Sequence, residues 1–206
     1  EAYVAAGKAL QLDQTLANPH IIQGQFYWSK SHNFAHEEAI NEFKKAILKD
    51  SKSFTAFEQL SLVQLHIGLF EEALSNAKKS IELEPSNYRA RRYIGETLFF
   101  SGDYELSLIE FEKIPKYFAP ELTQTLLALN HFYLKRPDKA IALLDDNLAN
   151  SPSNSLTNSV YAIILAGNGQ DSDARIKMNI ALDNSKDLIH IHHLYYQLGI
   201  ASAIMG

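Results

Sequence analysis

The chain has 206 residues, of which 46% are hydrophobic and 21% charged, and its 24 acidic and 19 basic side chains give a net charge of −5. This apolar content is enough to bury a core and argues against disorder, and no apolar run approaches the roughly 20 residues of a membrane-spanning helix. The absence of Cys excludes disulfide frameworks, zinc–thiolate sites, iron–sulfur clusters and thiol catalysis.

The mild acidity bears on the partners of the chain. A nucleic-acid binder carries a basic patch, and a protein held by anionic lipid carries a polybasic cluster, but neither occurs here. We therefore expect a protein or peptide partner, no nucleic acid, no membrane insertion and no cofactor. The segment begins with Glu and without a leader, so we expect it to be cut from something longer. The cytoplasm is the expected compartment and the periplasm the alternative, since a chain without Cys suits either.

Small residues recur along the chain with a step of 33 to 35 residues. The position of Ala39 recurs at Ala73, Ser107, Ala140 and Ala174. Five such copies predict a repeat architecture, in which each unit buries its apolar face against the next.

Each copy has the pattern of two helices joined by a turn. Apolar residues at helical spacing precede Gly68, Gly102 or Gly169, and a second periodic stretch follows and ends at Pro, as at Pro85, or at a polar residue. Gly after a helix can adopt the left-handed cap conformation, and Pro cannot continue a helix. Small residues on the first helices (Gly24, Ser61, Gly95, Ala128 and Ala162) are expected to face the small residues of the second helices, which allows close antiparallel packing.

These units resemble the tetratricopeptide repeat (TPR), a helix–turn–helix pattern of about 34 residues. Residues 54–87 match it best, including Leu60, Ser61, Phe70, Ala73 and Pro85, and the resemblance covers nearly the whole chain. It implies an all-α fold, a right-handed superhelical α-solenoid of antiparallel helix pairs. It also implies that the first helices line a concave, ligand-binding side.

We expect one repeat domain over residues 1–206, with five full repeats between two half repeats. The expected order is a half repeat at 1–16, full repeats at 17–53, 54–87, 88–120, 121–154 and 155–191, and a half repeat at 192–206. The turn SKSHNF of the first full repeat is about three residues too long, Lys135 replaces the turn Gly of the fourth, and Pro120 is expected to close the third. The two half repeats predict that the natural array continues at both ends.

The residues of the first helices that are not needed for packing are expected to line a groove for an apolar segment. The alternative is that neighbouring helices or turns cover them. The expected groove residues are Trp28, Gln59, Leu62, His66, Arg89, Arg92, Tyr93, Glu96, Phe100, Leu126, Leu129 and Tyr133, with Val160 and Ile163 further along.

A clamp for peptide carboxylates, as in the chaperone-binding TPR proteins, is not expected. Only Arg89 matches one of its basic positions, and Gln59 and Tyr93 stand where Asn and Arg are required. Arg89, Arg91 and Arg92 form a local basic patch with neighbouring lysines, interpreted as a solvated face, with an acidic partner as the alternative.

Catalysis and metal binding have little support in the sequence. His190, His192 and His193 lie together, and His190 and His193 would share a helix face and could ligate zinc, but the three lack a carboxylate partner, so we expect no metal. A Gly-rich phosphate loop and a nucleophile elbow are both absent from the sequence. We therefore expect no enzyme.

The predicted function is that of a protein–protein interaction module that holds a peptide or protein segment in its concave groove. It would be an adaptor or the regulatory arm of a larger protein; the phrase HHLYYQLGIASAIMG is similar to a final repeat of bacterial signalling proteins. The alternative is a structural spacer or self-association scaffold without a separate ligand, whose open repeat ends stack on other copies.

Overall fold

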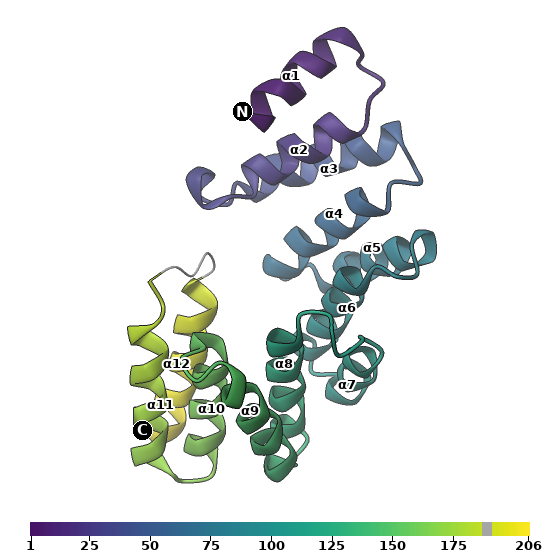
Figure 1. Cartoon of the computed structure of the whole chain (residues 1–206). Coiled ribbons are helices and arrows are strands. Elements are labelled where there is room, and N and C mark those ends of the chain that lie inside the picture. The colour runs from purple at the N-terminus through teal and green to yellow at the C-terminus, as the bar shows by residue number, and fades with distance from the viewer. Residues whose placement is uncertain (187–190) are drawn as a thin grey trace. The chain divides into compact units, whose positions relative to one another are not determined.

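The computed structural model describes residues 1–186 and 191–206, and these form α-helices and one short 3₁₀ helix without any strand (Figure 1). The elements are α1 (Ala2–Leu12), α2 (Asn18–Tyr27), η1 (Lys30–His32), α3 (His36–Lys49), α4 (Phe54–His66), α5 (Phe70–Leu83), α6 (Tyr88–Phe100), α7 (Tyr104–Glu112), α8 (Pro120–Tyr133), α9 (Pro137–Asn150), α10 (Ser155–Gly167), α11 (Asp171–Asp183) and α12 (Ile191–Met205). The all-α prediction is confirmed for this part of the chain.

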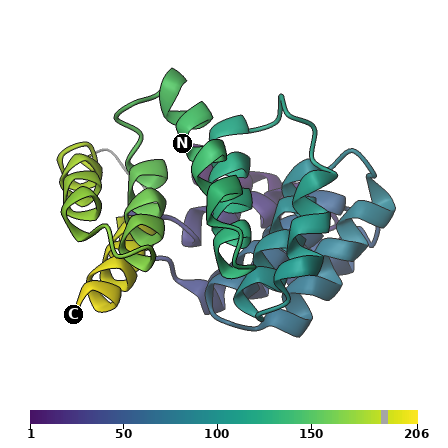
Figure 2. The same ribbon diagram turned by 90° about the horizontal axis from the view of Figure 1, so that it is seen from below.

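The helices belong to two compact units, Glu1–Asp103 with α1 to α6 and Tyr104–Gly206 with α7 to α12. The expected domain of residues 1–206 therefore comprises two units, and the division falls inside the expected repeat 88–120. Within the units, the two helices of a repeat pack against each other: α2 on α3, α4 on α5, α8 on α9 and α10 on α11. The pair α10 and α11 lies side by side in both views (Figures 1 and 2).

Small residues set the distance between the helices of each pair. A Cβ atom built on Gly24 of α2 would lie 2.4 Å from Cε1 of Phe43, which is fully buried in α3. In the next pair, the buried Ser61 hydroxyl of α4 donates to the Ala73 carbonyl of α5 at 2.9 Å. In the second unit, the same positions have no exposed surface and are occupied by Ala128, Ala140, Ala162 and Ala174. The predicted contact between small residues is seen directly at Ser61 and Ala73, whereas Gly24 faces the Phe43 ring.

We predict that Gly24→Ala destabilises the first unit by roughly 1–3 kcal/mol, because the new methyl overlaps the Phe43 ring. Gly7→Ala is the matched control, since Gly7 also lies in a helix but a Cβ there meets nothing within 4 Å. The control should be neutral or stabilising by up to about 1 kcal/mol. Urea unfolding of both variants measures the difference, and equal midpoints would contradict the packing argument.

The turns between paired helices share one backbone conformation. Gly68, Gly102 and Gly169 have φ angles of 79°, 89° and 75°, and Lys135 has a φ of 61° in the corresponding position. Each turn is closed by the same hydrogen bond, in which the next N–H donates at 2.9 Å to the carbonyl five residues earlier, as from Arg136 to His131. Lys135 therefore holds a left-handed conformation that costs a non-Gly residue roughly 1–2 kcal/mol.

Replacing Lys135 by Gly should relieve this strain. Part of the gain is offset because Gly has more conformational entropy than Lys in the unfolded chain. We therefore expect Lys135→Gly to raise the free energy of unfolding by about 0.5–1 kcal/mol. The reciprocal change Gly68→Lys should lower it. Thermal unfolding monitored by circular dichroism tests the pair, and a destabilised Lys135→Gly would mean that the Lys135 side chain contributes more than its backbone strain costs.

Three elements depart from the regular repeat. The long turn of the first full repeat contains η1 and two consecutive left-handed residues, Asn33 and Phe34. Helix α7 already ends at Glu112, before Pro115, and Pro120 does not close this repeat but is the first residue of α8, where a missing N–H costs little. The backbone of α12 lies closest to α10, whereas α4 and α6 both lie close to the second helix before them; the Leu194 and Leu198 side chains of α12 pack with Ala181 and Met178 of α11.

Candidate partner-binding face

In the first unit, α4 packs beside α2 and α6 beside α4, so the first helices of successive repeats form a continuous face. We call this the first-helix face. It carries nine of the twelve expected groove residues, on α4, α6 and the C-terminal cap of α2.

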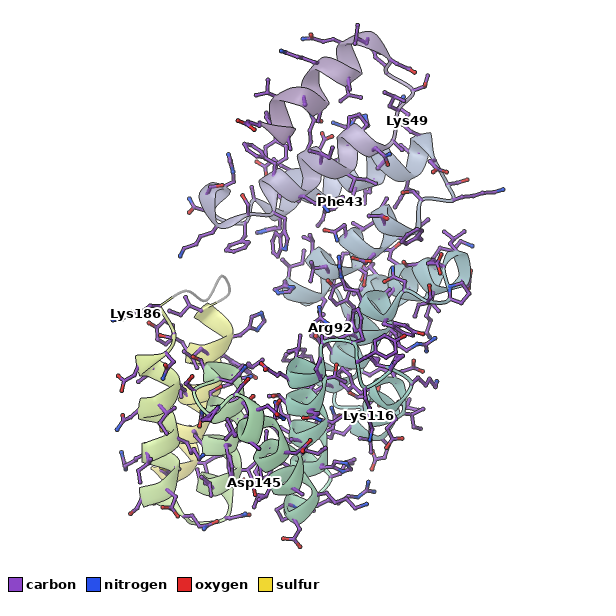
Figure 3. All side chains as sticks on the ribbon, in the orientation of Figure 1. Phe43, Lys49, Arg92, Lys116, Asp145 and Lys186 are labelled. Carbon is purple, nitrogen blue, oxygen red and sulfur yellow. The ribbon has the colours of Figure 1, made fainter. Side chains whose placement is uncertain are left out.

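Arg92 and Glu96 form an ion pair along α6 on this face (Arg92 is labelled in Figure 3). The Arg92 guanidinium also lies 4.6 Å from the centroid of the Tyr93 ring. Burial raises the pKa of the Tyr93 hydroxyl to about 12, so this group is uncharged at neutral pH. The positive charge of Arg92 is therefore already balanced within α6.

Arg89 is neutralised by a buried carboxylate. Its Nη1 donates to Glu58 Oε1 at 3.3 Å, and Glu58 also accepts from Asn87 at 2.8 Å and from Gln59 at 3.0 Å. The Glu58 side chain is only 6% exposed, against 56% for Arg89. Two of the arginines of the expected basic patch thus have carboxylate partners on the same face, which makes an acidic ligand a poor match for it.

These hydrogen bonds belong to a polar system between successive repeats that the sequence reading missed. Asn87 accepts from the Ala90 N–H at the start of α6 and donates to Ser80 and Glu58. Two repeats later, Asn154 accepts from the Thr157 N–H at the start of α10 and donates to Glu121 at 2.7 Å. The recurrence of Asn in one capping position is the signal that could have revealed it.

We predict that Glu58→Gln lowers the free energy of unfolding by roughly 1–3 kcal/mol. The amide replaces one acceptor oxygen by a donor and leaves the buried Asn87 amide or Arg89 without its carboxylate. Glu82→Gln is the control, because its pair with Lys79 is exposed and should be worth at most about 1 kcal/mol. Chemical unfolding of both variants tests this, and an equal effect would remove the special role of Glu58.

Trp28 lies at the end of α2, beside the long turn. Its ring makes edge contacts with Phe34, at a centroid distance of 5.3 Å, and with His66, at 5.5 Å. The His66 imidazole is fixed in turn by a 2.9 Å contact between its Nδ1 and the Leu62 carbonyl. The buried indole Nε1 of Trp28 finds no hydrogen-bond partner among the described residues. An unsatisfied donor beside two left-handed residues is costly and typical of functional surfaces.

The twelve expected groove residues differ in the surface that they offer. Phe100 is 43% exposed and Arg89 is also exposed, but Gln59, Tyr93 and Leu129 are only 8%, 3% and 7% exposed and offer little contact area to a ligand. The remaining seven are half-buried: Trp28, Leu62, His66, Arg92, Glu96, Leu126 and Tyr133. Val160 and Ile163 expose no surface at all and belong to the core of the second unit.

In the second unit, Leu126 and Tyr133 both lie on α8. The Tyr133 ring stacks on Tyr104 of α7 at a centroid distance of 4.9 Å. Burial, together with the nearby hydroxyls of Tyr104 and Tyr196, raises the pKa of Tyr133. Leu126 and Tyr133 thus offer a smaller apolar surface of their own.

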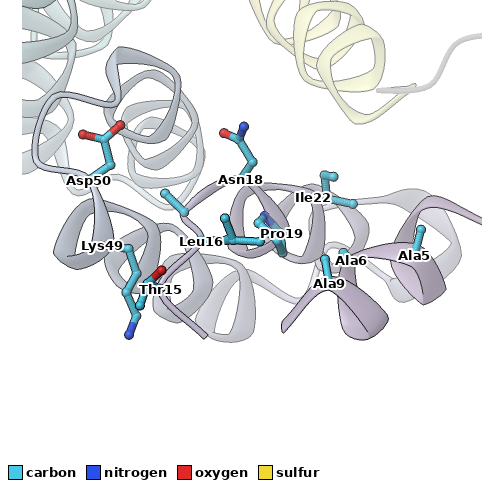
Figure 4. Close-up of a pocket in the computed structure, with 11 residues that line it drawn as sticks. Ala5, Ala6, Ala9, Thr15, Leu16, Asn18, Pro19, Ile22, Lys49 and Asp50 are labelled. Carbon is cyan, nitrogen blue, oxygen red and sulfur yellow. The ribbon is translucent and has the colours of Figure 1, made fainter. Parts of the chain in front are cut away.

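A pocket of about 550 Å³ lies between α1, α2 and the end of α3 (Figure 4). The sequence reading did not predict it. Helix α1 lines it only with Ala5, Ala6 and Ala9, whose methyl groups leave space above Pro19 and Ile22 of α2.

Metal binding finds no support in the part of the chain that the structure describes, which holds no group of three His, Asp or Glu side chains placed to share an ion. The expected trio lies partly outside it: His190 is not described, nor is the side chain of His192. Among the described helices, none combines the length and apolar character needed to cross a membrane.

Comparisons with known proteins point to one fold. No family model matches the sequence, and no curated protein matches it. Solved structures do match. A tetratricopeptide repeat protein from Parabacteroides merdae is 14% identical, with a TM-score of 0.74 over 97% of this chain and 76% of that one. The thermophilic TPR protein TTC0263 from Thermus thermophilus is 20% identical, with a TM-score of 0.71 over 91% and 99% of the two chains. YrrB, described as a TPR protein with an unusual peptide-binding site, is 18% identical, with a TM-score of 0.64 over 94% and 97%.

At these identities the likeness shows the fold and not the function. The chain has the TPR fold, an α-solenoid of helix pairs, as the resemblance of its repeats predicted.

Proposed function

We propose that the chain is a protein-interaction module that holds a peptide or a segment of a partner protein on the first-helix face of its first unit. It acts as an adaptor or as the regulatory arm of a larger protein, and the proposed role is binding rather than catalysis. The observation that carries the proposal is apolar surface, at Phe100, Leu62 and Trp28, beside arginines that are already paired.

The likeness to YrrB supports a peptide as ligand, since that protein is described as having a peptide-binding site. The chemistry of the face favours an apolar segment, because a half-buried aromatic ring gives a large contact area at a low entropic cost. The paired charges of Arg89 and Arg92 would then exclude strongly charged competitors, which could not displace Glu58 and Glu96 without leaving a buried charge unpaired.

We predict that Phe100→Glu reduces capture of the partner about tenfold or more, because it replaces exposed apolar surface of the face by a charge. The measurement is capture from a native lysate on the immobilised chain, followed by quantitative mass spectrometry. Leu48→Glu is the matched control: Leu48 is 83% exposed on the second helix α3, and its replacement should leave capture unchanged.

Equal capture by the unaltered chain and by Phe100→Glu would place binding elsewhere. If no protein is specifically retained and the mass measured by light scattering rises with concentration, the result favours the alternative of a structural spacer or self-association scaffold. Circular dichroism of both variants should match that of the unaltered chain, since both side chains are exposed.

A further inference from the structure

In the second unit, the corresponding side of the first helix α10 is covered. The repeat step places Ile163 in the position that Leu62, Glu96 and Leu129 hold in earlier repeats. Leu62 and Glu96 are partly exposed in the first unit, whereas in the second unit Leu129 is 7% exposed and Ile163 exposes no surface. Ser159, one turn before Ile163 on the same side of α10, is also fully buried.

Helix α12 provides a large part of this cover. It packs more extensively on α10 than on any other helix, and its Gln197 is hydrogen-bonded to the Ser159 hydroxyl. At the other end of α10, Met205 packs against Leu165 and Ala166. The backbone of α12 lies closer to α10 than to α11, and its Leu194 and Leu198 side chains pack with Ala181 and Met178 of α11.

The side of α12 that faces the unit is a narrow apolar stripe. Leu194, Leu198, Ala201 and Met205 follow one another at intervals of four, three and four residues, and the first three are buried. This spacing places them on one side of a helix. The other side carries Tyr195 and Tyr196, which are 56% and 59% exposed.

The sequence of α12, IHHLYYQLGIASAIM, contains no Asp, Glu, Lys or Arg, and its Leu194, Leu198 and Ala201 are buried against the unit. A docked amphipathic helix with an i, i+4, i+7 pattern is a common ligand of helical grooves.

We infer that α12 is a ligand in cis and that the surface of α10 and α11 beneath it binds an uncharged, amphipathic helix of a partner protein. This inference rests on the proposed function and names the partner class: a helix with Leu or Met at the positions of Leu194, Leu198 and Met205 and a small residue at that of Ala201. The partner helix binds only when α12 has left. The apparent affinity for the partner helix is therefore proportional to the fraction of molecules in which α12 is undocked.

The first test uses the full chain and a labelled peptide with the sequence of residues 191–205 as the probe, followed by fluorescence anisotropy. Leu198→Glu should release α12 by burying a charge in the stripe, and we expect it to bind the peptide at least about tenfold more tightly than the unaltered chain. Tyr196→Glu is the matched control on the exposed side and should leave the affinity unchanged. A folded Leu198→Glu that gains no affinity overturns the inference.

The second test needs no variant. It is decisive if the Leu198→Glu substitution unfolds more of the chain than α12 alone. In native-state hydrogen exchange of the unaltered chain, α12 should exchange at least about tenfold faster than α10, because α12 opens while the rest of the unit stays folded. Equal exchange in α10 and α12 would make α12 an inseparable part of the core and overturn the inference. A failure here leaves the proposed function standing, since the Phe100→Glu capture experiment concerns the other unit.

Discussion

The close approach of paired helices at one small residue is the constraint on which the rest of this structure depends. At Gly24 the Phe43 ring occupies the space of the missing side chain, and in the next pair the Ser61 hydroxyl replaces ring contact by a hydrogen bond to the Ala73 carbonyl. Once this distance is fixed, the first helices of neighbouring repeats can lie beside one another. Their remaining side chains then form a shared face, the one on which we propose that a partner binds.

The polar groups of that face are largely committed to the fold itself. Glu58 receives hydrogen bonds from three side chains, and one of them, Asn87, also caps α6. The Glu58 carboxylate can be buried here only because its hydrogen-bond partners compensate for the lost hydration. Charged groups of this face therefore contribute to the architecture, while Trp28, Leu62 and Phe100 give it apolar and aromatic surface.

Helix pairs and turns were predictable from the sequence because their signals are local. Helical periodicity, Gly at the turns and the recurring small residue indicate each pair without knowledge of its neighbours, and even Lys135 was placed correctly by register. The candidate face was predictable only in part. Periodicity shows which side of a helix is apolar, but it does not show what lies against it, and so Tyr93 and Ile163 were expected to contact ligand although both are buried.

The same limit applies to two further details. Periodicity shows that Leu194 and Leu198 lie on one side of a helix, but only the three-dimensional arrangement shows that they pack with Ala181 and Met178 of α11 while the backbone of α12 lies nearer to α10. Pro115 and Pro120 both stand near the end of the expected repeat 88–120, and a proline can end one helix or begin the next. The Ala-lined pocket exists because small side chains of α1 leave space unfilled, and a pattern of apolar residues does not show how much space remains between two helices.

The position of Trp28 has one more consequence. It is the only tryptophan of the chain and lies in the first unit, so indole emission senses that unit alone, whereas the far-ultraviolet circular dichroism sums the helices of both. Comparing the two signals along a single denaturation curve therefore separates the halves without any labelling. Coincident transitions mean that the chain unfolds as one cooperative block, and separated ones make the division after Asp103 a thermodynamic boundary as well as a geometric one.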